Sequence, residues 1–305
     1  MDMMSLTFKV LPAIEREFTM NVNGLDLAVR TWGDKKNPPI LAIHGWLDNC
    51  ASFSRIAPYL DHYYIVAPDL AGHGKSDHRK PNQAYYLWDY AIDLSIFVRK
   101  MGWNSYSILA HSMGTGVASI LNTISKGIKR IVFIDGMGAP FTVSAEDVVQ
   151  HLKTSLRLSE IAHLTKLNGF SEKNQPQFSS MEVAVKTRQK VVGGFISLDS
   201  ARRLAERDLR AVESGYRWRH DPRLTIPEPI QLTDAQAGRF LNQIDCPLTI
   251  LLGTNGLFVG DKFHSKSEYL GKNAKVSWYE GGHHLHLENL SHEMILDIKS
   301  SFANH

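Results

Sequence analysis

Short apolar runs recur along this chain and alternate with segments in which apolar residues return every three or four positions. Runs that are apolar throughout are typical of parallel strands, because helices cover both faces of such a sheet. Residues 87–101, in contrast, carry Leu87, Ala91, Leu94 and Val98 at helical spacing. This alternation predicts an α/β fold with a mostly parallel sheet and helices on both faces. We expect strands at residues 40–43, 64–67, 103–109, 131–134, 248–252 and 275–279, and further helices at residues 53–60, 113–127 and 291–302.

A different pattern opens the chain. Apolar and polar residues alternate from Phe18 to Val22 and again from Leu25 to Val29. Between these segments, Asn23 and Gly24 form a two-residue turn signal of the kind that joins antiparallel strands. The pattern therefore predicts a β-hairpin ahead of the parallel sheet.

The strand–helix alternation breaks after the fourth central strand. From residue 140 to about residue 239 we find segments of helical period and no convincing strand, which predicts a helical insertion. Thr233 and Gln236 resemble a capping box that opens the helix leading back to the main domain. We therefore divide the chain into a core at residues 1–139, a helical cap at 140–239 and the rest of the core at 240–305.

The insertion is rich in arginine. At helical spacing, basic residues usually form a solvated face with acidic partners such as Glu206 and Asp208. We expect this role for Arg202, Arg203, Arg207, Arg210, Arg217, Arg219 and Arg223.

The composition of the chain argues against several classes of protein. A chain of 305 residues with 43% hydrophobic content can bury a large core. The net charge of +3 and the absence of a long basic run argue against a nucleic-acid partner. Two cysteines, Cys50 and Cys246, are too few for a disulfide framework, and no run of eighteen apolar residues occurs. With no leader pattern at residues 1–5, we expect a cytoplasmic protein without a membrane span.

The candidate nucleophile is Ser112, which follows an apolar strand and precedes a helix. A serine on such a strained strand-to-helix turn needs very small neighbours two positions away on either side. Ala110 and Gly114 meet this need, although the usual pattern has glycine at both positions. Gly116 then permits close packing of the new helix against the sheet.

Four ordered motifs resemble the α/β-hydrolases, and specifically the serine hydrolase-like proteins. They are the oxyanion segment at residues 44–46, the glycine-rich turn at 69–76, the elbow around Ser112 and the histidine segment at 282–288. The resemblance implies the α/β-hydrolase fold: a mostly parallel eight-stranded sheet with one antiparallel strand, and a helical lid inserted after the sixth strand.

A serine nucleophile needs a base and an anion-stabilising site. We assign the base to His283, which follows the last strand and a Gly-Gly pair, and which aligns with the histidine of the resembled family. Its neighbours His284 and His286 are expected to line or pack the site. The developing negative charge needs backbone N–H donors, which we expect from Trp46 and Met113.

The acid that orients the histidine is less obvious. Many relatives place it after the seventh strand, where this chain has Gly256. Asp135, at the end of the sixth strand, is our candidate for the triad. Asp261, in the loop beyond Gly256, is the alternative acid, and Asn255 is a third, neutral option.

These features predict a cofactor-independent serine esterase that acts on small-molecule esters of short to medium acyl chain through an acyl-enzyme. Lactonase, thioesterase and carbon–carbon hydrolase are alternative activities for the same triad. A non-catalytic binding protein on a hydrolase scaffold is a further alternative, since fold alone does not determine activity. No metal-ligand or nucleotide-binding spacing is found. The oligomeric state is open, with a homodimer as one option.

Overall fold

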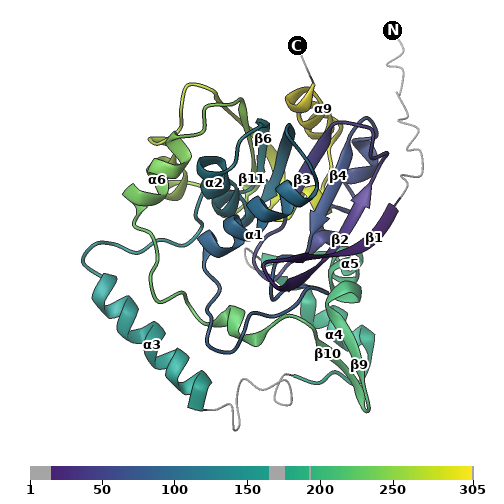
Figure 1. Cartoon of the computed structure of the whole chain (residues 1–305), viewed down its shortest axis with the longest axis vertical. Coiled ribbons are helices and arrows are strands. Elements are labelled where there is room, and N and C mark those ends of the chain that lie inside the picture. The colour runs from purple at the N-terminus through teal and green to yellow at the C-terminus, as the bar shows by residue number, and fades with distance from the viewer. Residues whose placement is uncertain (1–14, 165–175, 192–193, 304–305) are drawn as a thin grey trace.

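The computed structural model describes residues 15–164, 176–191 and 194–303. An eight-stranded sheet crosses the molecule in the order β1-β2-β4-β3-β5-β6-β11-β12 (Figure 1). Within it, β2 alone runs against its neighbours, and the pairs from β4 to β12 are parallel. This confirms the predicted sheet with one antiparallel strand. The strands are β1 (Glu15–Val22), β2 (Leu25–Trp32), β3 (Pro39–Ile43), β4 (Tyr64–Pro68), β5 (Tyr106–His111), β6 (Ile128–Ile134), β11 (Leu248–Asn255) and β12 (Ala274–Gly282).

Both faces of the sheet are covered, which explains why its central strands are apolar throughout. In β3, Leu41 and Ile43 pack into one apolar cluster, whereas Ile40 and Ala42 pack into a second cluster on the opposite face. The first cluster includes residues of α1 (Leu87–Lys100), α2 (Gly114–Ile124) and α6 (Asp234–Asn242), and the second includes residues of α8 (Leu285–Glu288) and α9 (His292–Phe302).

The N-terminal hairpin and the return to the core follow the local signals. Asn23 and Gly24 have φ values of 54° and 81°, which a two-residue hairpin turn requires. Thr233 and Gln236 form the reciprocal capping box at the start of α6. The predicted domain boundary at residue 239 falls inside this helix.

The insertion lies between β6 and β11. It contains α3 (Val148–Leu164), α4 (Met181–Arg188), β7 (Lys190–Val191), β8 (Gly194–Phe195), α5 (Leu198–Asp208), β9 (Leu209–Val212) and β10 (Gly215–Trp218). Its parts α4, α5 and the β9–β10 hairpin build a small apolar cluster that Leu287 of α8 joins from the core, whereas α3 lies apart from them (Figure 1). Part of the predicted cap lies outside the described residues, namely 165–175 and 192–193. So do residues 1–14 and 304–305 of the predicted core, which include the segment 1–5 considered for a leader.

Two predictions of helix are wrong. Residues 53–60 contain no α-helix; two short 3₁₀ turns, Cys50–Phe53 and Ala57–Tyr59, lie there, because Pro58 has no N–H to continue a helix. The insertion also contains the strands β7 to β10. Leu209 and Val212 continue the helical spacing of α5, but the helix ends at Asp208 and these residues pair with β10.

The expectation of a solvated arginine face is wrong for Arg207. This side chain is 2% exposed, although it belongs to α5 of the insertion. Its Nε donates to Asp69 Oδ2 at 2.8 Å and its Nη1 to Glu17 Oε1 at 2.6 Å. Asp69 lies at the end of β4 and is fully buried, so this ion pair ties the insertion to the core.

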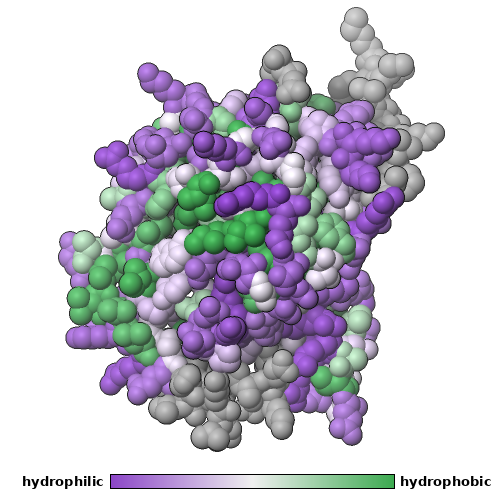
Figure 2. Space-filling model, in the orientation of Figure 1, coloured by the Kyte–Doolittle hydropathy of each residue, from purple (hydrophilic) through white to green (hydrophobic). Residues whose placement is uncertain are grey.

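Apolar side chains are exposed on α3. Val148, Val149 and Leu156 are 40%, 60% and 51% exposed, and Figure 2 shows apolar residues gathered on the left edge, where α3 begins in Figure 1. In the described part of the chain, no helix has both the length and the apolar character needed to cross a membrane.

Candidate active site

Ser112 occupies the sharp turn between β5 and α2. Its φ of 52° lies in the left-handed region, which a residue other than glycine adopts only where the surrounding structure imposes it. A Cβ on Gly114 would lie 2.3 Å from the carbonyl oxygen of Ile43, so glycine is needed for α2 to begin this close to β3. The turn therefore holds the Ser112 hydroxyl at the carboxyl edge of the sheet.

Ser112, His283 and Asp135 form one chain of hydrogen bonds. Nε2 of His283 lies 2.8 Å from Oγ of Ser112, and Nδ1 lies 2.5 Å from Oδ2 of Asp135. All three side chains are buried. Because an ionised carboxylate only accepts hydrogen bonds, Nδ1 carries the hydrogen and Nε2 presents its lone pair to the hydroxyl. The structure thus brings together the nucleophile, base and first-choice acid named from the sequence.

Asp135 fills the space that a side chain at position 256 would need. A Cβ on Gly256 would lie 2.1 Å from Oδ1 of Asp135. Asp135 has a φ of 38° and also accepts hydrogen bonds from the backbone N–H groups of Gly253 (3.0 Å) and Leu257 (2.9 Å). The alternative acid, Asp261, is exposed at the first turn of α7 (Asp261–Ser267) and makes no hydrogen bond to His283.

The protonation state of His283 follows from its surroundings. Burial lowers the pKa of this imidazole to about 4, against the opposing effect of the hydrogen bond to Asp135. A histidine with this pKa is neutral at pH 7. It is therefore in the form that accepts a proton from serine.

Two backbone N–H groups near Ser112 are left without an acceptor among the described residues. In the described chain, the N–H groups of Trp46 and Met113 donate no hydrogen bond. Met113 directly precedes α2, where the helix dipole also favours negative charge. Trp46 lines the cavity beside Ser112.

The insertion holds the loop that carries Trp46. The indole Nε1 of Trp46 donates to the carbonyl of Leu224 at 2.8 Å. Arg188, at the end of α4, donates to the carbonyl of Leu47, whose φ of 59° is also in the left-handed region. The insertion therefore supports the backbone conformation of this loop.

A cavity of about 370 Å³ opens beside Ser112 and His283. Apolar side chains form much of its wall, and three basic residues and one acid, Asp48, add charge to it. The sequence patterns did not single out these charged residues, because they come from separate segments. The lining includes Trp46, Pro140, Phe141, Leu257, Phe258, Arg188, Lys190, Lys262 and Asp48.

Comparisons with known proteins bear on the fold and the family of this chain. The family model described as "alpha/beta hydrolase fold" matches residues 38–290. The chain is similar to a "Probable serine hydrolase" of Drosophila melanogaster, with 31% identity over 89% of this chain and 83% of the relative. A "Serine hydrolase-like protein" of Danio rerio is 29% identical over 95% and 89%. Among solved structures, a hypothetical protein of Pseudomonas aeruginosa PAO1 is 36% identical, with a TM-score of 0.83 and coverage of 94% and 97%.

Proposed function

The chain belongs to the alpha/beta hydrolase superfamily and its group of serine hydrolase-like proteins, and on this premise we propose that it cleaves carboxylic esters through an acyl-enzyme. The observation that carries the proposal is the hydrogen-bond chain from Asp135 through His283 to Ser112. Serine is a weak nucleophile at neutral pH and needs an adjacent base held by a third group. This chain of contacts supplies both.

In the first half-reaction, Oγ of Ser112 attacks the ester carbonyl carbon and its proton passes to Nε2 of His283. Asp135 stabilises the imidazolium that forms. The carbonyl electrons move to oxygen, and the N–H groups of Trp46 and Met113 donate to that oxyanion, where one such donor contributes about 3–4 kcal/mol. Collapse of the intermediate expels the alkoxide, which takes the proton from His283.

The second half-reaction uses the same groups on water. His283, neutral again, accepts a proton from a water molecule as its oxygen attacks the acyl carbon. The tetrahedral intermediate then releases Oγ of Ser112, which recovers its proton from His283. A carboxylic acid leaves, and the free enzyme is restored.

The cavity supports substrates with short to medium acyl chains. Its volume of about 370 Å³ lies at the lower end of the range for small-molecule sites, about 300–1,000 Å³. Phe141, Leu257 and Phe258 supply apolar wall for the acyl group. A long triglyceride chain exceeds this space.

A panel of p-nitrophenyl esters tests the proposal. We expect kcat/KM to be highest from the butyryl to the octanoyl ester and to fall for the palmitoyl ester. Ser112→Ala should lower kcat by several orders of magnitude. Ser119→Ala is the matched control, because Ser119 is a buried serine of α2 whose hydroxyl donates to the Thr115 carbonyl at 2.8 Å.

Each outcome of the panel has a distinct meaning. Comparable hydrolysis by Ser112→Ala contradicts a serine mechanism. Preference for palmitoyl emulsions contradicts the chain-length assignment. If the folded wild-type protein hydrolyses no ester, lactone, thioester or activated carbon–carbon bond, the alternative of a non-catalytic binding protein replaces the proposal.

A further inference from the structure

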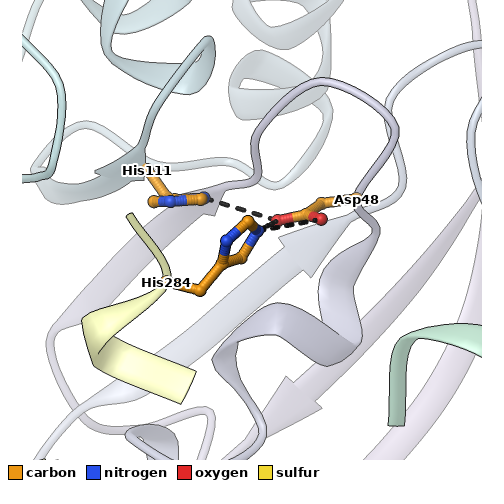
Figure 3. Close-up of side chains that lie close together, drawn as sticks. All are labelled: Asp48, His111 and His284. Carbon is orange, nitrogen blue, oxygen red and sulfur yellow. Dashed lines mark hydrogen bonds and ion pairs between the residues drawn. The ribbon is translucent and has the colours of Figure 1, made fainter. Parts of the chain in front are cut away.

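Asp48, His111 and His284 converge beside the proposed triad without belonging to it (Figure 3). Asp48 lies in the loop after β3, His111 ends β5, and His284 follows β12. These side chains are buried, with exposures of 3%, 1% and 4%. One ligand atom from each lies within 4.8 Å of the other two, and all three residues line the cavity.

Oδ2 of Asp48 is the point at which the contacts meet. Nε2 of His284 lies 3.2 Å from it, and Nδ1 of His111 lies 3.4 Å from it. Arg188 donates to the other oxygen, Oδ1, at 3.0 Å, and Ser52 Oγ donates to Oδ2 at 3.2 Å. The carboxylate is thus held in place while Oδ2 faces both imidazoles.

The tautomer of His111 is fixed by its other nitrogen. Nε2 lies 3.0 Å from the carbonyl oxygen of His283, and a carbonyl can only accept, so Nε2 carries the hydrogen. In the neutral ring, Nδ1 is then a lone pair that faces the carboxylate of Asp48. Nδ1 is buried and makes no hydrogen bond with any described residue. An imidazole nitrogen and a carboxylate oxygen that face one another at 3.4 Å are bridged either by a proton on Nδ1 or by a metal cation.

We propose that Asp48, His111 and His284 bind one zinc ion through Oδ2, Nδ1 and Nε2. Two histidines and one carboxylate form a recurring ligand set for zinc, with an open fourth position. Zinc–ligand distances of about 2.0–2.2 Å give a tetrahedron with edges of about 3.3–3.6 Å. The two contacts to Oδ2, at 3.2 and 3.4 Å, are close to that edge.

Two of the three residues have the outer hydrogen bonds expected of metal ligands, whereas Nδ1 of His284 has no partner among the described residues. A histidine that binds a metal usually donates its other ring N–H to a backbone carbonyl or carboxylate, as His111 does to His283. Metal-bound carboxylates are hydrogen-bonded in turn, as Asp48 is by Arg188 and Ser52. The rival arrangement has a proton on Nδ1 of His111 and another on Nε2 of His284, both directed at Oδ2 of Asp48; the zinc titration below distinguishes the two.

Zinc at this site would join three segments that also carry the proposed catalytic groups. These are the loop after β3 that contains Trp46, the end of β5 before Ser112, and the loop that contains His283. None of the three ligands is used in the proposed hydrolysis. The sequence analysis found no metal-ligand spacing, because the ligands are far apart along the chain.

Isothermal titration of the untagged, chelator-treated protein with Zn²⁺ tests the site. We expect one equivalent to bind, and Asp48→Asn and His284→Gln each to weaken binding by more than about 100-fold, beyond the loss seen for outer-shell partners. At about 100 times the Kd, zinc should raise Tm by about 4 °C. Cobalt substitution should give the intense visible bands of a tetrahedral site in the wild-type protein and not in either variant.

Controls separate this site from other histidines and from the proposed hydrolysis. His62→Gln removes an exposed histidine outside the ligand set and should bind zinc like the wild type. Ser112→Ala should also bind zinc normally. The zinc titration therefore tests the metal site even if the esterase proposal fails. Absence of binding to the folded wild-type protein, or unchanged Kd in both folded ligand variants, would overturn the site.

Discussion

Replacing Asp135 by asparagine tests how much this buried carboxylate contributes to both rate and stability. Its two oxygens accept three hydrogen bonds, from Gly253, Leu257 and His283. An amide has a single acceptor oxygen, so each of its two orientations turns the NH₂ group toward at least one buried N–H. One orientation also donates to Nδ1 of His283, which moves the ring hydrogen to Nε2 and removes the base.

The magnitudes follow from these contacts. A wrong tautomer and an unsupported imidazolium lower kcat by up to about 10⁴-fold, equivalent to about 5.5 kcal/mol of barrier. One unsatisfied buried N–H costs about 1–3 kcal/mol of unfolding free energy. For 305 residues, an unfolding entropy of about 0.64 kcal/mol per kelvin converts this to a fall in Tm of about 2–5 °C.

The assay compares kcat for the butyryl ester and Tm for the wild type, Asp135→Asn and Asp261→Asn. Asp261 is the matched control, because it is exposed and does not contact His283. We expect the loss in Asp135→Asn alone. If Asp261→Asn loses the rate while folded Asp135→Asn keeps it within tenfold of wild type, the assignment of the acid is wrong.

Three further predictions follow from named contacts. Because His283 must be neutral to act and its pKa is lowered to about 4, kcat/KM should stay near its plateau down to pH 5 and fall below it; a midpoint near pH 6.5 would refute this. Gly256→Ala places a Cβ 2.1 Å from Asp135, so calorimetry should show about 1–3 kcal/mol of destabilisation together with reduced kcat, and an unchanged variant would contradict the contact. Arg207→Met leaves Asp69 buried without its ion partner, which should cost about 3–5 kcal/mol in denaturant unfolding; a loss below 1 kcal/mol would count against that coupling.

The parts of the fold that could be predicted are those encoded locally. The Asn23-Gly24 turn and the small residues around Ser112 determine backbone shape within a few positions. Apolar runs identify strands that are buried on both faces, as β3 shows. The observed sheet confirms these predictions, because each depends on neighbouring residues alone.

The rest depends on contacts between distant segments. Leu209 and Val212 continue the spacing of a helix, and only pairing with β10 makes them a strand. Arg207 has the spacing of a solvated residue, yet it is buried and forms ion pairs with Asp69 and Glu17. The convergence of Asp48, His111 and His284 likewise arises only from folding. No local pattern contains this information.

The most direct test of the esterase proposal is fluorophosphonate labelling of the folded protein. Phosphonylation requires an activated serine, because Oγ must displace fluoride from phosphorus while a base accepts its proton. Intact-mass and peptide analysis should find one adduct, on Ser112, in the wild type and in Ser119→Ala, and none in Ser112→Ala. An unlabelled wild-type protein, or equal labelling of folded Ser112→Ala, would contradict the assignment of Ser112 as the nucleophile.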